Sequence, residues 1–158
     1  RPLVGAGGTV VVPETTSLLN SPSYVERTLG DHSADASLAY GQRAETPGFY
    51  IMETQTDHWV EILTGLGATG VEILLAYTAE HPMQGHPLLP MLQVTGEAST
   101  QGVYGGDIDL CFGENPVKNS DKMLRLILRV ASRTYTPRTT VQGNTDFQFT
   151  RGLLGVSM

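Results

Sequence analysis

The sequence predicts an α/β fold in which helices cover a mainly parallel sheet of about four to six strands. Three apolar runs, at residues 49–52, 71–77 and 108–112, each end in a polar loop that carries acidic or histidine side chains. The second run is almost unbroken, which is typical of a strand covered on both faces of a parallel sheet. A helical pattern separates the first two runs, so these segments form a β-α-β unit with an expected right-handed crossover.

Length and composition favour one compact, soluble domain. The chain has 158 residues, a net charge of −6 and ten Lys and Arg, so we expect a single domain over residues 1–158 and no nucleic-acid partner. No run approaches the roughly 18 continuous apolar residues of a membrane helix, and no signal peptide is apparent. We therefore expect no membrane association. Cys111 is the only cysteine, which fits a small core residue and a cytoplasmic location.

The first strand is expected at residues 9–12, where β-branched side chains follow a glycine turn and Pro13 ends the run. The glycines at positions 5, 7 and 8 do not make a GxGxxG motif, because that motif needs a preceding strand, correct spacing and a following helix. The predicted fold is therefore Rossmann-like without a dinucleotide motif. The chain opens at Arg1, as expected for a processed or excised piece of a longer protein.

A first helix is predicted to begin at Ser21-Pro22, because serine is a good N-cap and proline is favoured at the first helical position. Its apolar pattern continues to Leu38 and Ala39, with a break near Gly30. The polar residues 42–47 then form a connector.

The clearest unit follows this connector. Residues 49–52 form a strand, Thr56 or Asp57 caps a helix, and glycines 65, 67 and 70 close that helix before the strand at residues 71–77. The apolar side chains of the helix at core spacing are Trp59, Ile62, Leu63 and Leu66.

The second half of the chain adds strands at residues 91–94 and 107–111 and a long helix capped by Asn119 or Ser120. The sequence does not determine the structure of the tail from Tyr135 onward. One face of the long helix carries Met123, Leu124, Ile127, Leu128 and Ala131. Its basic residues, which we interpret as a solvated face, are Lys122, Arg125, Arg129 and Arg133.

Candidate site residues cluster where the predicted strands end, which is the ligand-binding edge of open α/β sheets. His81 and His86 lie on one loop between prolines and are either catalytic groups, metal ligands or exposed loop residues. Asp107 and Asp109 are two apart and form either a ligand pair or the solvated start of a strand. Glu53 ends a buried strand, where a carboxylate is costly unless it is exposed or functional.

Several motifs in order resemble the C-terminal domain of the altronate and galactarate dehydratase family, which also includes sulfolactate sulfo-lyase. The resemblance covers most of the chain, and it depends on the order of the motifs more than on any one of them. The residues that carry it are Gly7-Gly8-Thr9 with Glu14, residues 47–54, Thr64-Gly65, Gly67-Ala68, Thr78, Gly85, Pro90, Asp107-Ile108-Asp109 with Gly113, residues 126–129 with Ala131-Ser132, and Asp146-Phe147.

This resemblance implies a hydro-lyase domain that eliminates water from a polyhydroxy carboxylate with a divalent metal, iron or manganese. Such a reaction needs a base, a cation that holds the carboxylate, and an acid for the leaving hydroxyl. The resemblance also implies that preceding domains or a partner chain complete the enzyme. We assign catalytic roles to His81, His86 and Glu53, substrate binding to Thr54, Thr78, Glu80 and Gly85, and metal binding to Asp107 and Asp109.

Two departures from the family pattern support other functions. After Thr78 the family carries a glycine-arginine-glycine-serine run, whereas residues 79–83 here read Ala-Glu-His-Pro-Met. The passage from Gly41 to Pro47 is also shorter than in the family. The alternatives are a non-catalytic ligand-binding or assembly module, and a scaffold that forms a homo-oligomer or docks a catalytic chain.

Overall fold

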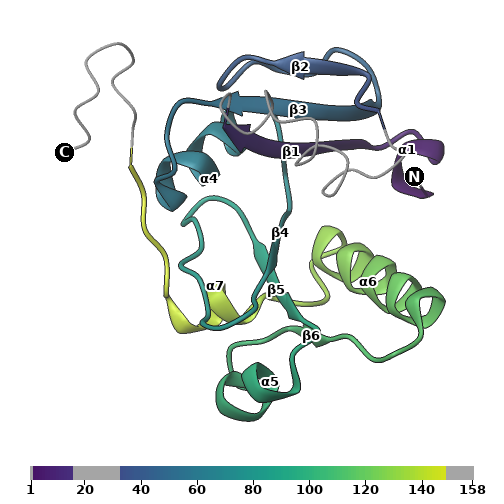
Figure 1. Ribbon diagram of the computed structural model, residues 1–158, viewed down its shortest axis with the longest axis vertical. Helices are drawn as coiled ribbons and strands as arrows, with labels where there is room; N and C mark the ends of the chain where they lie inside the picture. Colours follow the sequence, from purple (N-terminus) through teal and green to yellow (C-terminus); the bar gives the residue numbers. More distant parts are fainter. Residues whose placement is uncertain (1, 16–32, 149–158) are drawn as a thin grey trace. The chain divides into compact units, whose positions relative to one another are not determined.

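The computed structural model describes residues 2–15 and 33–148. The chain divides into two compact units, Arg1–Val71 with Gln148–Met158, and Glu72–Phe147. Each unit contains a three-stranded parallel sheet flanked by helices (Figure 1). The α/β class with parallel strands is thus confirmed, although two sheets of three replace the single larger sheet. That residues 1–158 form one domain stays a prediction.

The first unit is built around β3 (Gly48–Thr54), which lies between β1 (Thr9–Thr15) and β2 (Ala36–Leu38). A short helix, α1 (Pro2–Gly5), precedes β1. The prediction that Pro13 ends the first strand is wrong, because β1 continues to Thr15 in parallel register with β3. As β1 is an edge strand, a proline there is tolerated without loss of a ladder hydrogen bond.

Leu38 belongs to a strand, not to the predicted helix. It is buried and pairs with Met52 of β3, so sheet pairing overrides the helical reading of Leu38 and Ala39. Residues 33–37 of that predicted helix are not helical either, and residues 21–32 lie outside the described residues. The connector at residues 42–47 is confirmed as a segment without helix or strand.

The helix α4 (Trp59–Ala68) follows β3 and buries Val60, Leu63 and Leu66. Its N-cap is His58, not Thr56 or Asp57; the Thr56 hydroxyl instead accepts a hydrogen bond from the His58 N–H. Glycines 65 and 67 lie inside the helix rather than closing it. At Gly65 a Cβ would clash with the Tyr40 ring, and the helix ends at Ala68 with Thr69 as its C-cap, before Gly70 with φ +95°.

The second unit is built around β5 (Met91–Thr95), which lies between β4 (Leu74–Tyr77) and β6 (Leu110–Cys111). All five residues of β5 are buried. The strand β4 is shorter than predicted, and its side chains alternate between buried and exposed because one face of the strand, which carries Leu75 and Tyr77, is not covered. The predicted β-α-β unit is wrong as a single-sheet unit, since β3 and β4 belong to different sheets.

Three helices complete the second unit, namely α5 (Ala98–Tyr104), α6 (Pro116–Ala131) and α7 (Arg138–Gln142). The cap of α6 is Asn115, whose side chain accepts a hydrogen bond from the Lys118 N–H, so the helix begins before the predicted Asn119 or Ser120.

The buried face of α6 also differs from the prediction. Leu126 and Val130 pack against Leu92 of β5, whereas Leu128 and Ala131 are exposed. The apolar stripe is therefore rotated about the helix axis relative to the predicted one. The basic residues of α6 and Arg133 after it are exposed, as expected.

The carboxylate of Asp109 joins three segments of this unit. Its Oδ2 accepts a hydrogen bond from the Gln93 N–H at 2.8 Å, and its Oδ1 accepts from the Tyr135 hydroxyl at 2.7 Å and the Arg138 N–H at 3.0 Å. Burial, and then the hydrogen bond to Asp109, raises the pKa of Tyr135. The Asp109 carboxylate thus binds β5, the segment after α6 and the first turn of α7. Asp109 itself lies before β6, and the strand predicted at residues 107–111 is reduced to two residues.

We predict that Asp109→Asn lowers the free energy of unfolding of this unit by about 2 to 3 kcal/mol, because an amide cannot replace all three acceptor contacts. Asp107→Asn is the matched control, since within residues 2–15 and 33–148 the Asp107 carboxylate makes no hydrogen bond; it should cost less than about 0.5 kcal/mol. Urea unfolding, followed by a signal from residues of the second unit, measures the free energy of unfolding of both variants. Equal losses in the two variants would contradict the assignment.

Candidate functional site

Five of the predicted site residues lie on one loop, residues 78–90, between β4 and β5 of the second unit. They are Thr78, Glu80, His81, Gly85 and His86. The loop leaves the carboxyl end of β4, the edge at which ligands bind in open parallel sheets. Glu53 and Thr54 lie at the carboxyl end of β3 in the first unit.

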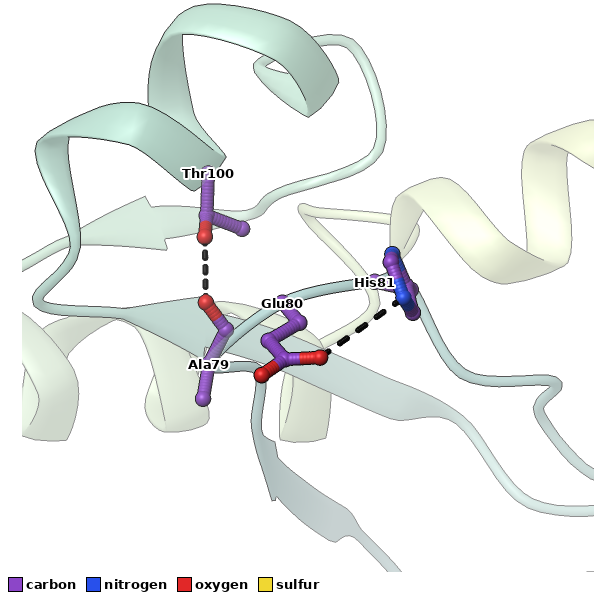
Figure 2. A network of polar contacts seen from close by, with 4 residues as sticks. All are labelled: Ala79, Glu80, His81 and Thr100. Carbon is purple, nitrogen blue, oxygen red and sulfur yellow. Dashed lines mark hydrogen bonds and ion pairs between the residues drawn. The ribbon is translucent and has the colours of Figure 1, made fainter.

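The backbone of the first half of this loop is fixed at both ends. The Thr78 N–H donates to the Val94 carbonyl at 2.8 Å, and the Thr78 hydroxyl donates to Gln93 Oε1 at 3.2 Å. The Met83 N–H donates to the same Gln93 Oε1 at 2.6 Å. From the other side, the Thr100 hydroxyl of α5 donates to the Ala79 carbonyl (Figure 2).

Between these anchors the loop exposes an acid and an imidazole. The side chains of Glu80 and His81 are 83% and 73% exposed, with Glu80 Oε2 3.8 Å from His81 Nε2. Figure 2 shows the carboxylate directed toward the ring. The Tyr104 ring of α5 meets His81 edge to face, with centroids 6.1 Å apart. Such an exposed polar contact contributes little to stability, but both groups are accessible to a ligand.

His86 has a different environment. It is 5% exposed, its Nδ1 accepts a hydrogen bond from the Leu88 N–H at 3.2 Å, and its ring meets Phe147 edge to face at 5.2 Å. Burial lowers the pKa of His86, which favours the neutral ring, and a neutral ring that accepts at Nδ1 carries its proton on Nε2. Its one lone pair is thus occupied by Leu88, and in this conformation it cannot act as a base or a metal ligand. The catalytic assignment of His86 stays a prediction, and it requires the hydrogen bond from the Leu88 N–H to break.

Gly85 also has a structural use. Its N–H donates to the Asn144 carbonyl at 2.9 Å, and its carbonyl accepts from the Asp146 N–H at 3.0 Å. A Cβ at this position would lie 3.3 Å from the Thr139 side chain. A small residue therefore allows the segment after α7 to pair with the loop.

The other predicted residues are not gathered into a metal site. All three hydrogen bonds of the Asp109 carboxylate are to protein groups, and Asp107 is half-buried nearby in sequence. Glu53 is half-buried, and the buried Thr54 hydroxyl donates to the Thr56 carbonyl at 3.0 Å. In the part of the chain that the structure describes, no three His, Cys, Asp or Glu residues lie close enough to hold a metal ion.

A family model described as D-galactarate/altronate dehydratase, C-terminal, matches residues 25–153. The chain belongs to this family. The resemblance of the sequence motifs is thereby confirmed, and the domain is one found in galactarate and altronate dehydratases. No curated protein matches the chain. None of the helices in residues 2–15 and 33–148 has the length and hydropathy that crossing a lipid bilayer requires.

In this dehydratase-family domain, three residues that shape the loop are not among the predicted site residues, namely Gln93, Thr100 and Tyr104. Gln93 stands out in the sequence as the one polar residue of the apolar run at residues 91–94. Thr100 and Tyr104 lie on α5, which was not predicted. A hollow of about 620 Å³ in the second unit, lined in part by Leu88, Val130 and Arg133, contains none of the predicted site residues.

We predict that the second unit loses stability as the pH falls below about 6.5, because the unfolded chain binds a proton at His86 more readily than the folded chain does. The check is the free energy of unfolding at about pH 7.5 and about pH 5.5. His86→Asn, which keeps an acceptor for the Leu88 N–H, should reduce the pH dependence. An identical pH dependence in wild type and His86→Asn would refute the role of His86.

Proposed function

We propose that this chain is a domain of a sugar-acid hydro-lyase that takes part in eliminating water from a polyhydroxy carboxylate. Membership in the galactarate/altronate dehydratase family supports the reaction class. The observation that carries the proposal within the chain is the fixed loop after β4, which exposes the Glu80 and His81 side chains at the carboxyl end of a parallel strand.

This pair suits proton transfer. Dehydration breaks a C–H bond beside the carboxylate and a C–O bond on the adjacent carbon, and releases water. A neutral imidazole at His81 accepts the proton, and the Glu80 carboxylate stabilises the imidazolium that forms. His81 then returns the proton to the departing hydroxyl, so one group serves as base and acid.

The remaining site residues take supporting roles in this proposal. The catalytic assignment of Glu53, at the end of β3 in the first unit, stays a prediction. Thr54 and Thr78 are buried and hydrogen-bonded within the protein, so they fix the ends of β3 and β4 rather than contact substrate through their hydroxyls. Gly85 keeps the loop close to the segment after α7.

The family resemblance implies a divalent metal, iron or manganese, which would hold the substrate carboxylate as it gains charge. The described residues do not fit a complete metal site, because Asp109 is committed to three protein hydrogen bonds and no three-ligand group is present among residues 2–15 and 33–148. We therefore propose that a metal would draw ligands from preceding domains or a partner chain, within a cytoplasmic enzyme.

One observation favours the alternative of a non-catalytic ligand-binding or assembly module. Residues 79–83 contain no arginine or lysine, so the loop lacks a cation of its own for a substrate carboxylate. In that case the fold would hold a ligand or a partner while another chain performs the chemistry.

Calorimetric titration with manganese and then with altronate or galactarate tests the proposal. We expect sugar-acid binding that weakens at least about tenfold in His81→Ala, because a direct polar contact is lost. His58→Ala is the matched control at an exposed histidine of the other unit and should bind like wild type. Binding that is unchanged in His81→Ala would contradict the site. If neither the chain nor its assembly with the preceding domains binds sugar acid, the assembly module is the better reading.

A further inference from the structure

Gln93 is a polar residue at the centre of the most buried strand of the second unit. Its side chain has no exposed surface, and its neighbours Met91, Leu92 and Val94 are apolar and buried. A carboxamide in such a place is unfavourable unless its polar atoms are hydrogen-bonded. Methionine would fill a similar volume without that cost, so the contacts of the amide indicate its role.

Only one half of the carboxamide has partners among the described residues. Its Oε1 accepts from the Met83 N–H at 2.6 Å and from the Thr78 hydroxyl at 3.2 Å. Its Nε2 has no hydrogen-bond partner within residues 2–15 and 33–148. Within these residues, the hydrogen bonds of the Gln93 amide are both to the ends of one loop segment, while its Nε2 stays unpaired. A general need to pair buried polar atoms therefore does not explain why a glutamine occupies this position.

We infer that Gln93 is a positioning residue, which fixes residues 78–83 so that Glu80 and His81 face a ligand in a set geometry. This inference rests on the proposed function of that pair. Gln93 holds the segment at Thr78 and Met83, and Thr100 holds Ala79 from α5. The same helix supplies the Tyr104 ring against His81, so β5 and α5 together define where the imidazole lies.

The buried hydrogen bond itself is open to direct measurement in the wild-type chain by NMR. We expect a scalar coupling across the hydrogen bond between the Met83 amide nitrogen and the side-chain carbonyl carbon of Gln93. We also expect the Met83 amide proton to exchange at least about 100-fold more slowly than that of His81, which has no such acceptor in the described structure. A missing coupling together with equal exchange rates would overturn the inference.

Three variants, compared with Tyr104→Leu as the reference that lacks the neighbouring ring, then test whether this contact positions His81. Gln93→Met keeps the shape but removes the acceptor, Gln93→Glu restores an acceptor, and Gln142→Met is the control at an exposed glutamine. In Gln93→Met the ring-current shift of the His81 imidazole should fall to that of Tyr104→Leu, and the Kd for galactarate should rise about tenfold. Gln93→Glu should recover both values, which a mere loss of packing would not predict.

The outcomes separate the inference from the function on which it rests. If neither wild type nor its assembly with the preceding domains binds galactarate or altronate, but Gln93→Met still shifts the His81 resonance, the proposed function fails and the positioning role stands. If wild type binds and Gln93→Met leaves both the resonance and the Kd unchanged, the positioning role is overturned. Should Gln93→Met not fold, Thr78→Val removes one of the two contacts and should move the His81 resonance in the same direction by less; no movement would overturn the inference.

Discussion

The hydrogen bonds between Asp109 and Gln93 are the constraint on which the second unit depends. The Asp109 N–H donates to the Gln93 carbonyl and its carboxylate accepts from the Gln93 N–H, both at 2.8 Å. These two hydrogen bonds fix the register of β5 relative to the segment that leads into β6. Because side chains alternate between the faces of a strand, a shift of one residue would turn the Gln93 amide away from the loop. The geometry of Glu80 and His81 thus begins at a carboxylate that touches neither of them.

The fold was predictable where local signals decide it. The strands at residues 49–52 and 91–94 and the helices containing Leu63 and Leu126 follow from apolar period and turn residues, and all are present. The division into two sheets was not predictable, because pairing depends on contacts between distant segments. Leu38 shows the same limit: its apolar side chain suits a helix or a strand, and only its pairing with Met52 decides between them.

The candidate site was predictable as a loop but not as an arrangement of side chains. His81 and His86 look equivalent in sequence, each beside a proline, yet one is exposed and the other is buried against Phe147. The spacing of the two histidines does not predict that burial, because the ring that packs against His86 comes from the segment after α7. Gln93 was overlooked for the opposite reason. Its position within an apolar run suggests a strand, and the loop that its amide holds lies 10 to 15 residues earlier in the chain.

The charges of the loop define what the proposed chemistry needs from elsewhere. Residues 79–83 carry a carboxylate at Glu80 and no arginine or lysine, so the electrostatic field of the loop repels a sugar-acid carboxylate unless His81 is protonated or a cation is nearby. A base must be neutral to accept a proton, so His81 cannot both attract the carboxylate and begin the reaction. The two tasks must fall to different groups. The loop is held by hydrogen bonds and is exposed, but it has no cation of its own to bind the substrate carboxylate. It is therefore suited to act against a surface that supplies this cation. In the function proposed here, the preceding domains or a partner chain make that contribution.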